Sequence, residues 1–252
     1  MHGARLRGRT ILLAAGLPAK HEEAFAVPAF GGWDIDQAVT ALARAVFAEG
    51  GRLVVQGDPA LALLVAMVAG EYQSQRFAEG SGPRDVSPTP PLSVYPGAER
   101  SDREREDAAL IEGLHLARID ALGQSLGVSA SDALGTLIDK EDPEALVCIG
   151  GGEDVLRQAR YFADRACNRP IFVLRHTGGA AARLADDPFF AIEQADVAIA
   201  EQVWTRARMR KGIEEFASDE RRYLLGQKIV PYPVVMQLIV DRLAGGEGLI
   251  KA

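Results

Sequence analysis

The stretch 145–154 constrains this chain most, because an apolar strand runs directly into three glycines and then into a helix. The strand Ala145–Ile149 is followed by Gly150–Gly152, and an acidic turn opens a predicted helix over Val155–Asp164. Glycines at such a junction let backbone N–H groups approach a ligand closely, and the helix N-terminus behind them favours an anion. The pattern favours a phosphate-bearing nucleotide as the ligand class. A tight packing corner is the alternative explanation.

A second glycine junction follows downstream. The predicted strand Ile171–Leu174 leads into Thr177, Gly178 and Gly179. Two adjacent glycine turns at the carboxyl ends of neighbouring strands mark the place where open α/β sheets bind ligands. Thr177 offers a hydroxyl donor and the glycines offer a concave group of N–H donors for an anion, although an ordinary helix cap explains them as well.

Strand and helix patterns alternate along the chain, which predicts an α/β fold with an open parallel sheet and helices on both faces. We expect one domain over residues 1–200 and a helical C-terminal extension over 201–252 that packs on it. Asp34 and Asp58 are expected to cap the first two helices. The predicted strands are 10–15, 52–56, 92–95, 145–149, 171–174 and 195–200; the predicted helices are 35–49, 60–71, 108–126, 129–138, 155–164, 202–217 and 233–243, and 77–91 is a predicted loop.

Composition narrows the partner classes. The chain has 252 residues, is 48% hydrophobic and carries a net charge of −7. The acidic balance argues against nucleic acid as a partner, because phosphate contacts need clustered Lys and Arg. Cys148 and Cys167 lack metal-binding spacing, so we expect neither a metal nor another cofactor. The apolar run Thr10–Ala15 is too short for an export signal and no run approaches transmembrane length, so we expect a cytoplasmic protein with no membrane partner.

Four segments at predicted strand ends carry a resemblance to a known family: Ile11–Pro18, Arg52–Ala60, Cys148–Glu153 and His176–Ala181. They resemble the SLOG superfamily, which is named for the DNA-processing protein DprA and the Lonely Guy phosphoribohydrolases. Within it, the chain is most similar to a bacterial branch linked with signalling and defence. The resemblance covers about residues 10–200. It implies a Rossmann-like fold that binds nucleotides without a metal, either to cleave an N-glycosidic bond or to sense a signal such as an ADP-ribose derivative.

The glycine turn departs from the motif of the hydrolytic relatives. Those proteins carry Pro-Gly-Gly-x-Gly-Thr-x-x-Glu, in which the final Glu takes part in catalysis. Aligned on the glycines, this chain has Ile149 for the Pro, Glu153 for the third motif Gly, Asp154 for the Thr and Arg157 for the catalytic Glu. An arginine stays cationic and cannot act as a general base, but it can hold a phosphate with two hydrogen bonds. This departure favours binding over hydrolysis.

The candidate ligand-binding residues follow from the glycine turns and from the neighbouring strand ends. Glu153 is expected to hold ribose hydroxyls or to act as a displaced catalytic acid/base, with simple helix-dipole stabilisation as the alternative. The resemblance implies that Arg118 binds the substrate, and a surface ion pair is the alternative role for this residue. Trp33 and Tyr95 are candidates for stacking on a base, or for the core. The full ligand-binding set is Gly16, Gly57, Arg118, Gly150, Gly151, Gly152, Glu153, Arg157, Thr177, Gly178 and Gly179.

These patterns lead to three hypotheses about function. The first is a sensor that binds a nucleotide or an NAD- or ADP-ribose-derived ligand at the glycine turns, and we expect it to form a homo-oligomer. The second is a nucleotide N-glycosidase or phosphoribohydrolase with Glu153 in the catalytic role. The third is a non-catalytic subunit whose C-terminal helix docks a partner through Val234, Val235, Leu238 and Ile239. A dehydrogenase is disfavoured, because the glycines follow a late strand rather than the first.

Overall fold

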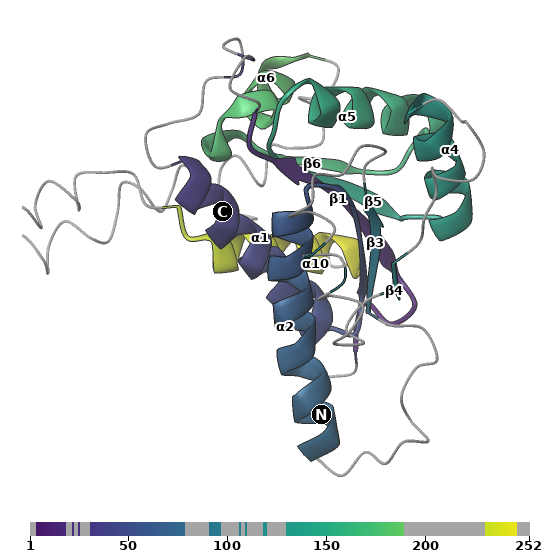
Figure 1. Ribbon diagram of the computed structural model, residues 1–252, viewed down its shortest axis with the longest axis vertical. Coiled ribbons are helices and arrows are strands. Elements are labelled where there is room, and N and C mark those ends of the chain that lie inside the picture. Colours follow the sequence, from purple (N-terminus) through teal and green to yellow (C-terminus); the bar gives the residue numbers. More distant parts are fainter. Residues whose placement is uncertain are drawn as a thin grey trace, which may run out of the picture.

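The computed structural model describes residues 4–18, 22, 25, 31–78, 91–96, 106, 109, 118–119, 130–188 and 230–245. These residues form a six-stranded parallel sheet with helices on both faces (Figure 1), which confirms the predicted α/β fold. The strands are β1 (Thr10–Gly16), β2 (Arg52–Gly57), β3 (Leu92–Pro96), β4 (Arg118–Ile119), β5 (Ala145–Gly150) and β6 (Ile171–Leu174). The helices are α1 (Gly31–Ala48), α2 (Pro59–Ala78), α4 (Ala130–Glu141), α5 (Glu153–Arg165), α6 (Gly179–Asp186) and α10 (Tyr232–Leu243), with a 3-10 turn at Arg175–Thr177.

The strand order β4-β3-β2-β1-β5-β6 places the first strand in the middle of the sheet. The chain builds outward from β1 to β4 on one side and then returns to β5 and β6 on the other. The order therefore reverses between β1 and β5, where Gly16 pairs with Gly150 in register. This arrangement is Rossmann-like, and such a reversal point is where open α/β sheets leave a crevice at the carboxyl ends of their strands.

Two hydrophobic clusters cover the two faces of the sheet. Helices α1, α2 and α10 pack on one face, and α4, α5 and α6 pack on the other (Figure 1). Side chains alternate along β1, so that Ile11 and Leu13 point to the first cluster while Leu12 and Ala14 point to the second. Because both faces are buried, the central strands are apolar throughout, as parallel strands usually are.

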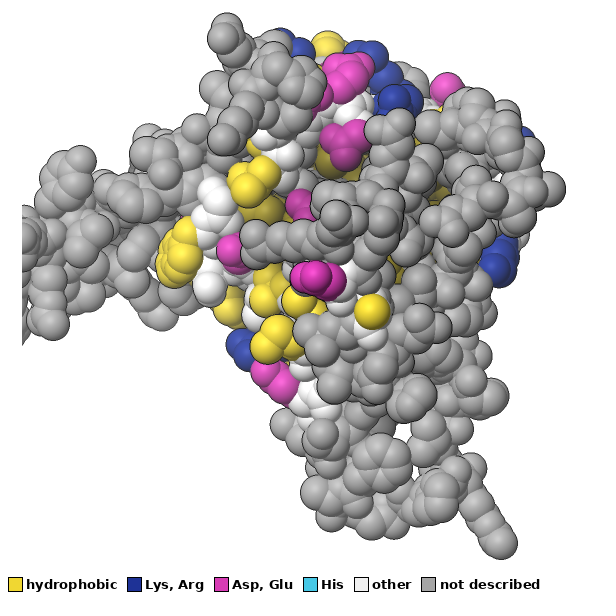
Figure 2. Space-filling model, in the orientation of Figure 1, with side chains coloured by type: hydrophobic (Ala, Val, Ile, Leu, Met, Phe, Trp, Pro, Cys, Tyr) yellow, Lys and Arg dark blue, Asp and Glu magenta, His cyan; other side chains and the backbone are white. Residues whose placement is uncertain are grey.

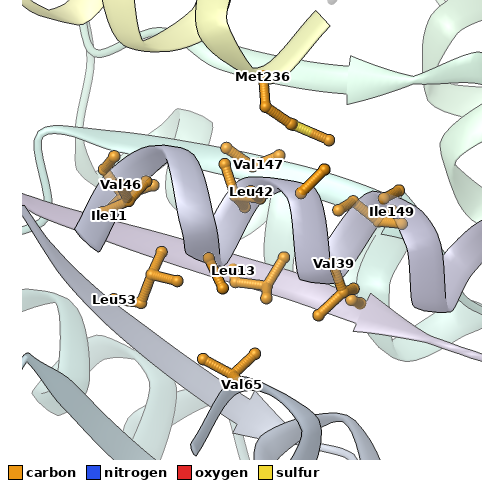
Figure 3. Close-up of a cluster of buried hydrophobic side chains, with 14 of the residues drawn as sticks. Ile11, Leu13, Val39, Leu42, Val46, Leu53, Val65, Val147, Ile149 and Met236 are labelled. Atoms are coloured by element: carbon orange, nitrogen blue, oxygen red, sulfur yellow. The ribbon is translucent and has the colours of Figure 1, made fainter. Parts of the chain in front are cut away.

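Helix α1 lies along β1 and β5 and is the centre of the first cluster. Figure 3 shows its side chains Val39, Leu42 and Val46 facing the strands, with Met236 of α10 on one flank and Val65 of α2 on the other. All five are fully buried. The C-terminal helix α10 is therefore an integral layer of this core.

The C-terminal helix uses its apolar side chains inside the chain. Val235 and Ile239, two of the four residues considered for partner docking, are fully buried in the first cluster. Leu238 packs partly against the same cluster, and only Val234 is exposed, at 37%. The predicted strand 195–200 and the predicted helix 202–217 lie outside the described residues.

Several predicted boundaries are confirmed and others are wrong. Asp58 caps α2 as expected, since its Oδ1 accepts hydrogen bonds from the backbone N–H groups of Ala60 (2.9 Å) and Leu61 (3.4 Å). Asp34 is not a cap, because α1 already begins at Gly31 and Asp34 lies within its first turn. Helix α2 runs to Ala78 rather than to residue 71, because the helix-forming residues of 71–78 continue it up to the Gly-rich segment.

The predicted helix 108–126 is also wrong in its centre. Arg118 and Ile119 form the short strand β4, which pairs with Ser93 and Val94 of β3. Pairing at the sheet edge has overridden the local helical pattern. Arg118 therefore sits on an edge strand and not on a helix.

A buried ion pair fixes α4 on the second face, near the amino ends of the strands. The Nη1 of Arg52 lies 2.7 Å from Oε2 of Glu141, whose side chain is only 2% exposed. Arg52 also donates to Ser93 Oγ (2.5 Å), and Tyr95 Oη donates to the other carboxylate oxygen of Glu141. Tyr95 is thus a core residue in this network. Within the described ranges, no helix has the length and hydrophobicity to cross a bilayer.

Candidate functional site

The carboxyl ends of β1, β2 and β5 bring most of the predicted site residues to one edge of the sheet. Gly16 ends β1, Gly57 ends β2 and Gly150 ends β5. The second junction, Thr177–Gly179, follows β6 at the same edge. Arg118 is the exception, because β3, β2 and β1 separate β4 from β5. At about 4.8 Å per strand, Arg118 lies roughly 19 Å from the glycine turn.

The two glycine turns are hydrogen-bonded to each other and to β1. The N–H of Gly150 donates to Thr177 Oγ1 (2.7 Å), and the N–H of Gly151 donates to Gly16 O (2.6 Å). In return, the N–H of Ala180 donates to Gly151 O (2.8 Å). Thr177 is fully buried, and its hydroxyl donates to Leu174 O (2.6 Å). These donors are used within the chain.

Close packing at the junction explains why glycine is needed at several of these positions. Gly151 and Gly179 both have left-handed backbone angles, with φ of 81° and 60°. A Cβ on Gly151 would lie 2.2 Å from a methyl carbon of Val155, and one on Gly179 would lie 2.4 Å from Gly151 O. A Cβ on Gly150 would lie 2.4 Å from Cδ1 of Ile35. The packing-corner explanation thus accounts for these three glycines.

The first turn of α5 is bonded to a carboxylate from far earlier in the sequence. The N–H of Glu153 donates to Oε1 of Glu22 (3.0 Å). The carboxylate of Glu22 packs directly on Gly152, where an added Cβ would lie 2.0 Å from its Oε2. The helix N-terminus that was predicted to hold an anion therefore already faces a negative group of the same chain.

Phe25 holds the backbone of Glu22 against the second cluster. Its N–H donates to Glu22 O (2.9 Å), and its ring is buried in the second cluster. The guanidinium of Arg183, on α6, lies 4.6 Å from the centre of this ring. The sequence analysis did not identify Glu22 and Phe25, because the residues around them show no periodicity and no motif. Only the fold brings them close to the glycine turns.

Further carboxylates make this edge of the sheet acidic. Glu153 and Asp154 are exposed in the first turn of α5. Partial burial raises the pKa of Asp34, and this effect outweighs the lowering by a hydrogen bond from Tyr232. Partial burial and the charge of Asp58 together raise the pKa of Asp36. Figure 2 shows acidic side chains lying between hydrophobic ones on the face in view.

Arg157 is the basic residue nearest the first turn of α5 among the predicted set, and it is exposed. It stands one turn beyond Glu153 on the same helix. Among the described residues, no three His, Cys, Asp or Glu side chains are grouped so that they could hold a metal ion.

Among the described residues, space is left beside Gly16, and two buried amides lie on the same face of the sheet. Gly16 is buried, yet a Cβ added to it would meet no atom of the described residues within 4 Å. Gln56, the next-to-last residue of β2, lies on the same face as Val54 of the second cluster. Its Oε1 is buried and has no hydrogen-bond partner within the described part of the chain, and the same is true of Oε1 of Gln158 on α5.

An exposed aromatic side chain stands at the start of α1. Trp33 lies in the first turn of this helix and is 60% exposed. Leu17, which directly follows β1, is 59% exposed. Its side chain lies close to the first turn of α1, because its Cδ2 would be 3.8 Å from a Cβ added to Gly32. Trp33 is therefore not a core residue. It offers a flat apolar surface at the carboxyl edge of β1, of the kind on which a base can stack.

Comparisons with known proteins give a fold likeness only. The chain is similar to the X-ray structure of TM1055, a Northeast Structural Genomics Consortium target, at 14% sequence identity and a TM-score of 0.41. The match covers 71% of this chain and 81% of TM1055. No protein-family model and no curated protein sequence matches the chain.

Proposed function

We propose that this protein binds a nucleotide or a nucleotide-derived ligand at the carboxyl edge of β1 and β5. The observation that carries the proposal is that, among the described residues, no atom fills the space beside Gly16, which lies at the point where the strand order reverses. The exposed Trp33 supplies a stacking surface at the same edge, and Glu153 supplies a carboxylate for ribose hydroxyls. The resemblance of four strand-end segments to SLOG proteins supports the same ligand class.

We further propose that the role is sensing, with an NAD- or ADP-ribose-derived compound among the candidate ligands. Arg157 stands where the hydrolytic relatives carry their catalytic Glu, and an arginine cannot replace that acid. This departure from the hydrolytic motif supports binding without hydrolysis. A homo-oligomer is part of this proposal, as is membership of the SLOG superfamily.

A second candidate function is hydrolysis of an N-glycosidic bond, because Glu22 lies beside Glu153. N-glycosidic cleavage needs a carboxylate that stabilises positive charge on the ribose or activates water, and a pair of acidic groups is the usual way to supply it. Glu22 Oε1 is 3.0 Å from the backbone N of Glu153, so the two carboxylates belong to the same helix end. In this candidate function, Glu153 takes the role that Arg157 cannot.

The test is a thermal-shift titration of the full chain with AMP, CMP, GMP, UMP, NAD and ADP-ribose. A ligand at about a hundred times its dissociation constant stabilises the fold by about 2.7 kcal/mol, which is a shift of several degrees. Gly16→Leu is the site variant, because it places a bulky side chain in the proposed site, and its melting temperature without ligand reports whether it folds. Ala48→Leu introduces the same side chain at the exposed far end of α1 and is the control.

We expect at least one ligand to stabilise wild type and Ala48→Leu but not Gly16→Leu. A flat panel for the wild type, or an unchanged response in Gly16→Leu, contradicts the proposal. Base release is measured on the same samples by chromatography. For the hydrolase candidate, Glu153→Gln should abolish base release while affinity stays within a few-fold. If the wild type releases no base from any ligand in the panel, hydrolysis is rejected.

A further inference from the structure

We propose that the outer face of α2 is a dimer interface, on which α2 of a second copy of this chain packs in the antiparallel direction. The residues of this face, which we call the α2 stripe, are Ala60, Leu63, Leu64, Met67 and Gly70. The inference deepens the homo-oligomer of the proposed function and rests on that part of it. It does not depend on which ligand the carboxyl edge of the sheet binds.

The first argument is that α2 is apolar on all sides over most of its length. Residues 59–70 read Pro-Ala-Leu-Ala-Leu-Leu-Val-Ala-Met-Val-Ala-Gly and include no charged side chain. A surface helix normally carries charged or polar residues on its outer side, whereas a helix that is apolar all round is normally buried all round. Because α2 covers one face of the sheet, the fold of a single chain buries only its inner side. The sequence of α2 therefore predicts a second contact on the outer side.

The second argument is that large apolar side chains of α2 remain exposed. Leu61 and Val65 are buried in the first cluster, and Figure 3 shows Val65 pointing into it. Met67 lies on the opposite side of the helix and is 60% exposed. Leu63 and Leu64 stand one turn before Met67, flank it on the helix surface and are only partly buried. Contiguous exposed apolar surface of this kind marks a contact with another protein.

The α2 stripe is nearly symmetric about Val65, which favours a second copy of the chain as its occupant. The small residues Ala60 and Gly70 stand five positions before and after Val65, and the large residues of the stripe lie between them. When two such helices pack antiparallel, Leu63 of each copy meets the partner's Met67. A twofold axis requires this reciprocity, in which residue i contacts residue j and j contacts i.

The charges beside the α2 stripe fit the antiparallel direction. At its amino end, Asp36 and Asp58 lie close enough that the charge of Asp58 raises the pKa of Asp36. At its carboxyl end, Arg44 pairs with Glu71 at 3.4 Å, and both side chains are more than half exposed. Asp58 precedes Val65 by seven positions and Glu71 follows it by six, so a twofold axis at Val65 brings these two ends together.

The antiparallel arrangement therefore places Asp36 of each copy near the partner's Arg44. This contact attracts and also offsets the repulsion between Asp36 and Asp58 within each chain. A parallel pair of helices would instead bring the carboxylates of both copies together, and like charges across an interface oppose association. Apolar shape and charge thus select the same arrangement.

The experiment measures the dissociation constant of the dimer by sedimentation velocity of the full chain. The stripe covers roughly 15 Å of helix at 1.5 Å per residue, which is small beside the ~800 Å² per partner of a stable interface. We therefore expect a reversible dimer that forms between about 1 and 100 μM. Met67→Lys should weaken it at least about tenfold, because each dimer then buries two unpaired charges.

Val234→Lys is the matched control, because Val234 is an exposed apolar residue of α10, outside the α2 stripe. This variant should dimerise like the wild type. Met67 is exposed in the single chain, so Met67→Lys should fold, and its circular dichroism spectrum at a concentration where the wild type is monomeric checks this.

Charge reversals test the antiparallel direction. Asp36→Lys and Arg44→Glu each place like charges across the twofold axis, so each should weaken the dimer about tenfold or more. Both residues are exposed, so both variants should fold. An equimolar mixture of the two variants should dimerise about as tightly as the wild type. In the mixed pair, the introduced lysine meets the introduced glutamate on one side, and Asp36 meets Arg44 on the other.

The outcomes distinguish this inference from the proposed function. A dimer that Met67→Lys leaves unchanged uses another surface, which overturns the inference while the proposed homo-oligomer stands. Mixed variants that stay monomeric overturn the antiparallel arrangement. A wild type that is monomeric throughout the range overturns both the interface and the homo-oligomer, and means that a different protein or a membrane surface covers α2. Nucleotide binding is judged separately, by the thermal-shift titration.

Discussion

Replacing Gly179 with alanine tests whether the two glycine turns form one packed junction. The left-handed φ of 60° at Gly179 costs an alanine about 1–2 kcal/mol by itself. Its Cβ would also lie 2.4 Å from Gly151 O, about 1 Å closer than an ordinary contact of 3.4 Å. Relief requires the turns to separate, which breaks the bond from Ala180 N–H to Gly151 O and leaves a buried carbonyl unpaired, at about 1–3 kcal/mol.

Gly8 provides the matched control, because it has a φ of 81° and a Cβ there would meet nothing within 4 Å. Gly8→Ala should therefore cost only the backbone term, about 1–2 kcal/mol. Gly179→Ala should cost about 1–3 kcal/mol more, or roughly 2–12 °C in melting temperature for a domain of this size.

Thermal melting and urea unfolding of the two variants and the wild type measure this difference. The comparison is valid if the urea m-value is the same in all three proteins. Equal destabilisation of Gly179→Ala and Gly8→Ala would refute the reasoning, because it would mean that the contact between the turns contributes nothing beyond the backbone conformation.

Three further predictions concern cysteines, the buried ion pair and pH. Burial raises the pKa of the Cys148 thiol far above its usual range, whereas Cys167 is exposed. Iodoacetamide should therefore label only Cys167 in the native protein, which mass spectrometry can measure. Labelling of both cysteines in the native protein would contradict this prediction. Arg52→Met removes the guanidinium that pairs with the buried carboxylate of Glu141 and should cost about 3–5 kcal/mol in urea unfolding at pH 7, with most of the loss recovered by adding Glu141→Gln. Partial burial and the charge of Asp58 raise the pKa of Asp36, so the charged form of Asp36 destabilises the fold at neutral pH. Asp36→Asn should therefore raise the melting temperature at pH 7. This gain should disappear below the ordinary pKa of 3.8, because the carboxyl group is then protonated in both the folded and the unfolded state.

Five of the six described strands, and the sheet edge at which the glycine turns meet, were predictable because they depend on local patterns. Apolar runs identified β1, β2, β3, β5 and β6, of which β1, β2 and β5 end in glycine, and alternation of strands with helices indicated the parallel sheet. The carboxyl edge of β5 follows from that topology. In these parts of the chain, local preference and the final packing agree.

The chemistry of the edge was less predictable, because it depends on contacts between distant segments. Glu22 reaches α5 across 131 residues of sequence, and no spacing rule connects them. Thr177 looked like a ligand donor, yet its hydroxyl is buried between Gly150 N–H and Leu174 O. The short strand at Arg118 arises from pairing with β3, which local propensity does not encode. Such features require the fold before they can be inferred.

The packing of α10 has a consequence for how the chain folds during synthesis. The N-terminal strand region is tied to this helix by Arg5, which pairs with Asp241 (2.6 Å), and by Arg9, which donates to Leu243 O. These contacts span more than 230 residues, and α10 also covers the face of α1 shown in Figure 3. The first face of the sheet therefore lacks its α10 layer (Tyr232–Leu243) until those residues have been synthesised. Contacts of such long sequence separation are associated with slow folding.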